Sequence, residues 1–186
     1  MKHLFLYCLL NYLGSLYGTI PPADLQQYFT WKLIESGFRH ADDPCGDPTY
    51  YSDSYIVVYP CYVTKIKNAE SVELLLPDRK KETVYLAGIS CARNSVKDNQ
   101  KAKNFLKESL LNQRISLLLH DSDGLQVRRP RVVLMIGDED VNYEMLKAGL
   151  ADYRDEYYKL GDYDSCRYEL AAKDAKANKL GMWAAK

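Results

Sequence analysis

The sequence predicts a mixed α+β domain: a small β-barrel with helices, preceded by an apolar N-terminal helix. Short β-branched runs at 55–66, 71–77 and 83–90 are separated by polar turns, which is typical of strands. A segment with helical spacing follows at 95–113, and then two more strand-like runs, 114–120 and 131–137. Helical patterns at 141–153 and 164–180 come last. This element order is that of a five-stranded OB barrel with helical additions.

Size and charge limit the classes of function. With 186 residues, 47% of them hydrophobic, the chain can bury one core of ordinary size. Lys and Arg number 25, as do Asp and Glu, so no overall positive field concentrates a polyanion. We therefore do not favour a dedicated nucleic-acid binder. Such binding would need a local basic patch, for which Arg79-Lys80-Lys81 is the candidate.

Residues 1–20 form a targeting or anchoring segment. Positions 4–20 carry no charge, follow Lys2 and His3, and stop at Pro21-Pro22. About 17 apolar residues suit either a secretory signal peptide or a short membrane anchor, and a buried helix of the fold is the alternative. We expect a membrane-associated or secretory protein, with a mitochondrial membrane as the second choice.

Residues 21–54 are expected to connect this segment to the domain. Apolar residues at helical spacing in 23–38 predict an amphipathic helix, and the Asp-, Pro- and Ser-rich composition from 39 to 55 predicts an extended linker. The domain itself is predicted over 55–183. Pro60 cannot donate a ladder hydrogen bond, so the first strand should bend there or lie at an edge.

The cysteines leave two interpretations open. Cys8 lies in the leader, and the other four would permit two disulfides in an oxidising compartment or serve as small buried hydrophobic residues. Scattered histidines and the lack of a Cys-x-x-Cys pair argue against zinc. The four cysteines are Cys45, Cys61, Cys91 and Cys166.

Three stretches resemble the staphylococcal nuclease (thermonuclease) family. The run from Val141 to Ala151 is similar to the family's helix after the last barrel strand, and AAKDAKANKLGMW is similar to its C-terminal ending. The run VYLAGIS at 84–90 resembles the strand that enters the active site. The resemblance spans about 55–183 and implies an OB barrel of the staphylococcal nuclease type. Its motifs are packing signatures, so they argue for fold and not for activity.

The residues at the family's functional positions argue against its reaction. In active members, carboxylates hold calcium, another carboxylate serves as general base, and two arginines neutralise the phosphate. The resemblance places Glu70 at a metal-ligand position and Ser90 where an aspartate ligand is usual. It places Tyr85 at one arginine position and Arg93 at the catalytic glutamate. Arg129 or Arg131 aligns with the second arginine.

We therefore expect no catalytic residue, no cofactor and no metal site, since one carboxylate, Glu70, holds calcium poorly. The leading hypothesis is a non-catalytic module that acts as a binding or structural subunit for a protein partner such as a membrane complex. Tyrosines 153, 157, 158, 163 and 168 would be its contact surface, and the alternative is that they pad the barrel. One alternative is a calcium-dependent nuclease with a relocated site. Its candidate ligands are the acidic residues Asp121, Asp123, Asp138, Glu139 and Asp140. We interpret these residues as solvated turn residues. The other alternative is single-strand nucleic-acid binding without cleavage.

Overall fold

The structure, a computed structural model, describes residues 43–46, 55–91, 95–120, 125, 128–154 and 160–184. They belong to the compact unit Ala41–Lys186. The predicted leader at 1–20 and the amphipathic helix at 23–38 lie outside the described residues. No helix among the described residues has the length and apolar character needed to cross a bilayer.

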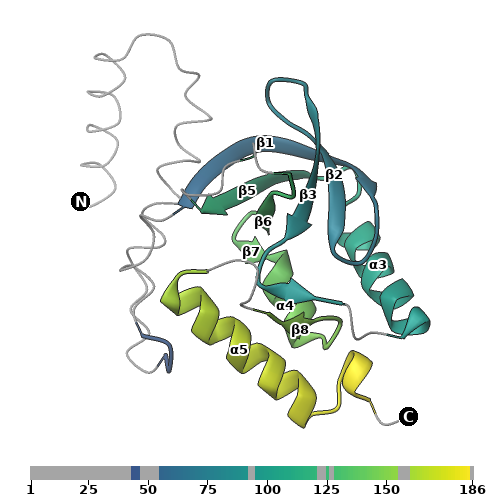
Figure 1. The fold of residues 1–186 in the computed structure, drawn as a ribbon, viewed down its shortest axis with the longest axis vertical. Coiled ribbons are helices and arrows are strands. Elements are labelled where there is room, and N and C mark those ends of the chain that lie inside the picture. The colour runs from purple at the N-terminus through teal and green to yellow at the C-terminus, as the bar shows by residue number, and fades with distance from the viewer. Residues whose placement is uncertain are drawn as a thin grey trace, which may run out of the picture. The chain divides into compact units, whose positions relative to one another are not determined.

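The five predicted strands correspond to β1, β2, β3, β5 and β6, and the two-residue strand β7 extends their sheet to six (Figure 1). The sheet order is β3-β2-β1-β5-β6-β7, and the parallel pairing of β3 with β6 closes it, with Tyr85 opposite Arg131. A separate two-stranded sheet joins β4 to β8. The bounds are β1 Tyr55–Ile66, β2 Ser71–Leu75, β3 Lys81–Leu86, β4 Ile89–Ser90, β5 Arg114–His120, β6 Arg131–Ile136, β7 Glu139–Asp140 and β8 Asp152–Tyr153.

The long strand β1 changes partners along its length. Its register with β5 shifts between Val58 and Cys61, around Pro60, and β2 pairs with β1 only from Tyr62 onward. Pro60 therefore sits at a bulge, in agreement with the expected bend. Past the bulge the side chains alternate as a half-buried strand requires: Cys61 and Val63 are buried, while Tyr62 is exposed.

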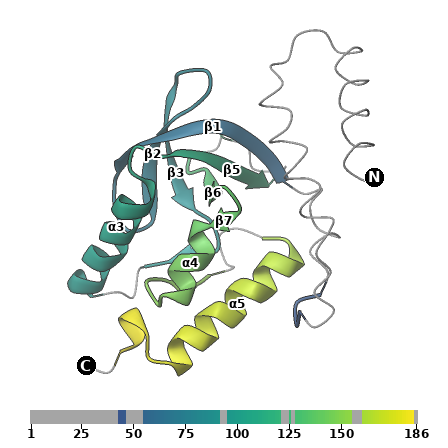
Figure 2. The same cartoon turned by 180° about the vertical axis from the view of Figure 1, so that it is seen from behind.

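Three α-helices accompany the barrel in the described part of the chain: α3 Val96–Leu110, α4 Val141–Lys147 and α5 Asp162–Ala177, followed by the 3-10 turn η3 Gly181–Trp183. In both views α4 lies between the barrel and α5 (Figures 1 and 2). Ser95 caps α3, where its hydroxyl accepts the Asp98 N–H at 3.2 Å.

The helix predicted over 141–153 is wrong in its second half. It ends at Lys147, and residues 152–153 form β8. Gly149 takes a φ of +64°, which a helix cannot continue through, and the Leu150 N–H returns to the Met145 carbonyl at 2.9 Å. The Gly-Leu-Ala signal is thus a helix end and not a helix interior.

Asp140 is a buried carboxylate at the centre of this helical layer. It is 5% exposed and caps α4 by accepting the Tyr143 N–H at 3.0 Å. From α5, the Tyr168 hydroxyl donates to both carboxylate oxygens at 2.8 and 3.0 Å, and Arg167 forms an ion pair with it. Burial raises the pKa of Asp140, while Arg167 and these hydrogen bonds oppose the rise. The prediction that Asp140 is a solvated turn residue is therefore wrong.

The tyrosines of the C-terminal part divide between padding and partial exposure. Tyr168 is fully buried, so of the two alternatives left open for it, padding of the barrel applies and contact with a partner does not. Its ring packs against Gly88, at whose position an added Cβ would lie 2.9 Å from the Tyr168 Cδ2. Tyr153 and Tyr163 are half-buried, whereas Tyr157 and Tyr158 lie outside the described residues.

Of the four cysteines, one pair forms a disulfide and the other pair serves as small buried hydrophobic residues. Cys45 and Cys166 form a disulfide, whereas Cys61 and Cys91 are buried free thiols. Burial raises the pKa of each free thiol to about 12, for Cys91 with a contribution from Glu70. The disulfide joins the turn at 43–46, which precedes the predicted domain 55–183, to α5.

Replacing Asp140 by Asn should lower the free energy of unfolding by about 2 kcal/mol, because it removes the buried anionic partner of Arg167 and leaves that cation with Asp164 alone. Urea denaturation measures this. The matched control is Glu144→Gln on the same helix, whose ion pair with Lys147 is more exposed and should contribute about 0.5 kcal/mol or less. Equal losses in the two variants would contradict the central role of Asp140.

Gly149→Ala should lower the free energy of unfolding by about 2 kcal/mol or more. The new Cβ would collide with the Leu180 carbonyl oxygen, a backbone atom, and the residue has a left-handed backbone conformation that alanine adopts only at a cost. Gly137→Ala is the control: its φ is +58° and nothing lies within 4 Å of its Cβ position, so only the conformational cost of about 1–2 kcal/mol applies. Thermal unfolding that ranks Gly137→Ala as the more damaging change would refute this packing argument.

Candidate functional site

The turn between β1 and β2 brings Glu70 to strand β4. Asn68 organises this turn, since its side-chain oxygen accepts the Glu70 N–H at 2.8 Å and the Ser71 hydroxyl at 2.9 Å. Glu70 Oε1 then accepts the Ser90 hydroxyl at 3.3 Å and the Cys91 N–H. Glu70 and Ser90, which the resemblance aligned with two metal-ligand positions, are therefore in hydrogen-bond contact.

A second group forms where β3 runs beside β6. Tyr85 is half-buried and pairs with Arg131, whose Nη1 donates to the Leu86 carbonyl at 3.2 Å. The guanidinium of the exposed Arg129 lies 5.7 Å from the centre of the Tyr85 ring, a cation–π geometry. The structure thus places both candidate arginines beside Tyr85, the residue that the resemblance aligns with the other arginine.

Backbone hydrogen bonds tie the two groups together. The Leu86 N–H donates to the Glu70 carbonyl at 2.9 Å, while the Leu86 carbonyl accepts from Arg131. Behind this strand, the buried Asn142 donates to the Ala87 and Val132 carbonyls at 3.0 Å each. The helix α4 therefore fixes the end of β3 on which the candidate site is built.

Calcium does not fit the donors that the structure describes here. The ion needs six to eight oxygens, several of them from carboxylates. The Glu70 oxygen already accepts two hydrogen bonds from the protein, and Ser90 offers an uncharged hydroxyl. Among the described residues, no three His, Cys, Asp or Glu side chains are grouped so as to hold a metal ion. Arg93 lies outside the described residues.

The other acidic candidates do not come to this site as a cluster. Asp138 is exposed in the turn after β6, Glu139 is exposed at the start of β7, and Asp140 is bound to α4 and α5. Asp121 and Asp123 lie outside the described residues. The buried Asp140 therefore does not join its two exposed neighbours in an acidic cluster for the alternative metal site.

Sequence reasoning missed two residues at the site. Asp152 stands opposite Ser90 in the β4–β8 ladder, and its Oδ2 lies 3.7 Å from Arg154 Nη2. It was missed because residues 149–153 were assigned to a helix; a C-terminal cap at Gly149 would have indicated the strand. The other is Cys91, whose N–H binds Glu70 and whose thiol lies 3.5 Å from the Ala69 and Leu150 carbonyls.

Comparison with known proteins adds the following. A family model described as Staphylococcal nuclease homologue matches residues 83–185. Thermonuclease from Staphylococcus intermedius is 28% identical over 145 residues, which cover 74% of this chain and 84% of that protein. The family match includes Tyr85, Ser90, Arg129 and Arg131 but begins after Glu70. The match to the thermonuclease covers 74% of the chain and therefore includes Glu70 as well.

Millimolar calcium should leave the Tm of the protein unchanged relative to the same buffer with chelator. A ligand that binds only the folded state, present at a concentration equal to its Kd, raises the free energy of unfolding by about 0.4 kcal/mol. This corresponds to a measurable rise in Tm of roughly 1–3 °C. A calcium-dependent rise that disappears in Glu70→Gln, but persists in the exposed-acid control Asp138→Asn/Glu139→Gln, would mean that calcium does bind at Glu70.

Proposed function

Because the chain belongs to the staphylococcal nuclease homologue family, we propose that it is a non-catalytic member of it. In this proposal the nuclease-fold domain acts as a binding or structural subunit that is held at or beyond a membrane. The uncharged residues 4–20 support the membrane part as a signal peptide or anchor. The partner is a protein, and no cofactor is needed.

The observation that carries this proposal is the state of Glu70. Its carboxylate accepts hydrogen bonds from the Ser90 hydroxyl and the Cys91 N–H. These donors occupy acceptor sites that a cation would use, and they contribute no negative charge of their own. Metal-assisted phosphodiester hydrolysis requires charge at this place, both to bind the ion and to activate water. Loss of a general base alone costs about 10²–10⁴ in rate.

Apolar exposure on β1 supports a protein-binding role. Ile56, Val57 and Tyr62 are 45%, 39% and 44% exposed, although large hydrophobic side chains usually lie inside. Tyrosine is enriched in protein interfaces, and the buried centre of an interface is more apolar than the rest of the surface. We therefore favour β1 as the first surface to test with candidate partners.

The second candidate function is phosphodiester cleavage with an altered site. Arg129 and Arg131 favour it, because both lie beside Tyr85 at the site and could neutralise a phosphate. The relative named Thermonuclease is similar to this chain over most of its length. Asp152 would then have to leave Arg154 and supply the missing carboxylate.

We expect residues 41–186 to show no calcium-dependent cleavage of single-stranded DNA or RNA, compared with the same protein in chelator. The matched control is the double variant Arg129→Ala/Arg131→Ala. Calcium-dependent turnover by the parent protein that is lost in this variant would contradict the non-catalytic proposal and establish the nuclease alternative. Turnover that survives in it would point to a contaminating enzyme.

A further inference from the structure

We propose that the Cys45–Cys166 disulfide is a reducible clasp that sets where the N-terminal part of the chain is attached to the domain. With the clasp closed, the chain joins the domain at helix α5. With the clasp open, it joins at the start of β1. This inference does not depend on whether the domain cleaves nucleic acid.

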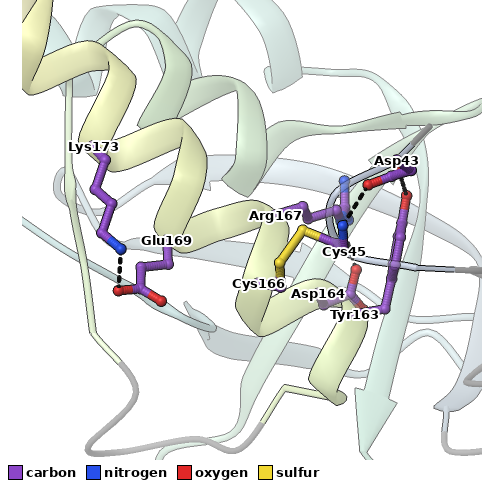
Figure 3. Close-up of a disulfide and its surroundings, with 8 residues drawn as sticks. All are labelled: Asp43, Cys45, Tyr163, Asp164, Cys166, Arg167, Glu169 and Lys173. Carbon is purple, nitrogen blue, oxygen red and sulfur yellow. Dashed lines mark hydrogen bonds and ion pairs between the residues drawn. A yellow bond between two sulfur atoms is a disulfide. The ribbon is translucent and has the colours of Figure 1, made fainter.

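The clasp joins two places that are far apart in sequence. The bonded cysteines are 121 residues apart, and their Cα atoms lie 5.5 Å from each other. Figure 3 shows the turn that carries Cys45 lying against α5, with Tyr163 beside it. The Tyr163 hydroxyl donates to Asp43 Oδ2 at 2.9 Å, and Asp43 Oδ1 accepts the Cys45 N–H at 2.9 Å.

Opening the clasp lengthens the connection to the domain. Cys45 precedes the first residue of β1, Tyr55, by ten positions (55 − 45). Ten residues of chain span at most about 33–36 Å. Whatever precedes Cys45, including the apolar residues 4–20, gains this additional reach when the bond is reduced. A closed clasp therefore holds α5 next to the attachment point, and an open one releases it.

The chemistry needs a dithiol reductant. Its thiolate attacks one sulfur of the clasp and forms a mixed disulfide, and its second thiol then displaces the remaining cysteine. Two electrons and two protons pass to Cys45 and Cys166, which become thiols, while the reductant becomes a disulfide. Both residues are half-buried and so within reach of such an attack.

The other cysteines of the domain do not compete in this exchange. Cys61 and Cys91 are 0% and 3% exposed, and burial raises the pKa of each thiol to about 12. Neither supplies a thiolate near neutral pH. Once the clasp is open, we expect the Tyr163–Asp43 hydrogen bond to be too weak to keep the turn on α5.

A specific protease site inserted after Pro48 in the full chain, solubilised in mild detergent, tests the clasp. After cleavage without reductant, the N-terminal fragment should stay with the domain even in denaturant. Under native conditions, dithiothreitol should release it, with circular dichroism unchanged. The Cys45→Ser variant should release the fragment without reductant, whereas Cys61→Ser should behave like the parent.

Each other outcome overturns the proposal. A fragment that separates in denaturant without reductant means that the disulfide does not form. A fragment that stays bound natively after reduction means that non-covalent contacts hold the turn. In that case Tyr163→Phe, which removes only the hydroxyl, identifies whether the Asp43 hydrogen bond is the contact responsible. Release accompanied by loss of the circular dichroism signal means that the bond supports the fold and is not a clasp.

Discussion

The rest of the structure depends on one buried carboxylate. Asp140 ends the short strand β7, caps α4, and binds Tyr168 and Arg167 of α5. A carboxylate without these donors would be too costly to bury, so the helices must dock together or not at all. Asp140 and Asp164 raise the pKa of Arg167 in spite of its burial, so the cation stays charged. The helical layer is therefore positioned by polar geometry as well as by apolar contact.

The candidate site stands on this layer, and its chemistry can change without disturbing it. The buried Asn142 follows Asp140 by two residues and binds the end of β3, next to which Glu70 and Arg131 meet at Leu86. Tyr85 and Ser90 are only half-buried, so side chains without charge fit there. The Asn142 hydrogen bonds and the β3–β6 pairing use backbone groups of the sheet, so they do not depend on which side chains stand at positions 85 and 90.

Sequence patterns predicted the strands and α3 well, because period-2 and helical spacing report burial directly. They failed at 148–153, where Gly149 ends α4 and the chain turns into β8. They also failed at Asp140, since an acidic run in a turn gives no sign that one member points inward. Pairing of Cys45 with Cys166 across 121 residues could not be predicted either. The last two failures concern contacts that only the folded topology creates, whereas Gly149 was a local signal for a helix end.

The clasp acts on the same element that supports Asp140. Cys166 is the residue before Arg167 and two before Tyr168, whose ring also packs on Gly88, close in sequence to Ser90. A force that reaches the domain through Cys45 is therefore applied to α5 next to Arg167 and Tyr168, the two residues that bind Asp140. Because α5 is joined to α4 by ion pair and hydrogen bonds, this attachment point is among the best supported in the described domain. A tether fixed at β1 would instead pull on a strand that is paired on one side only at its start, with β5. The position of the disulfide thus suits a domain that is held by its N-terminal side.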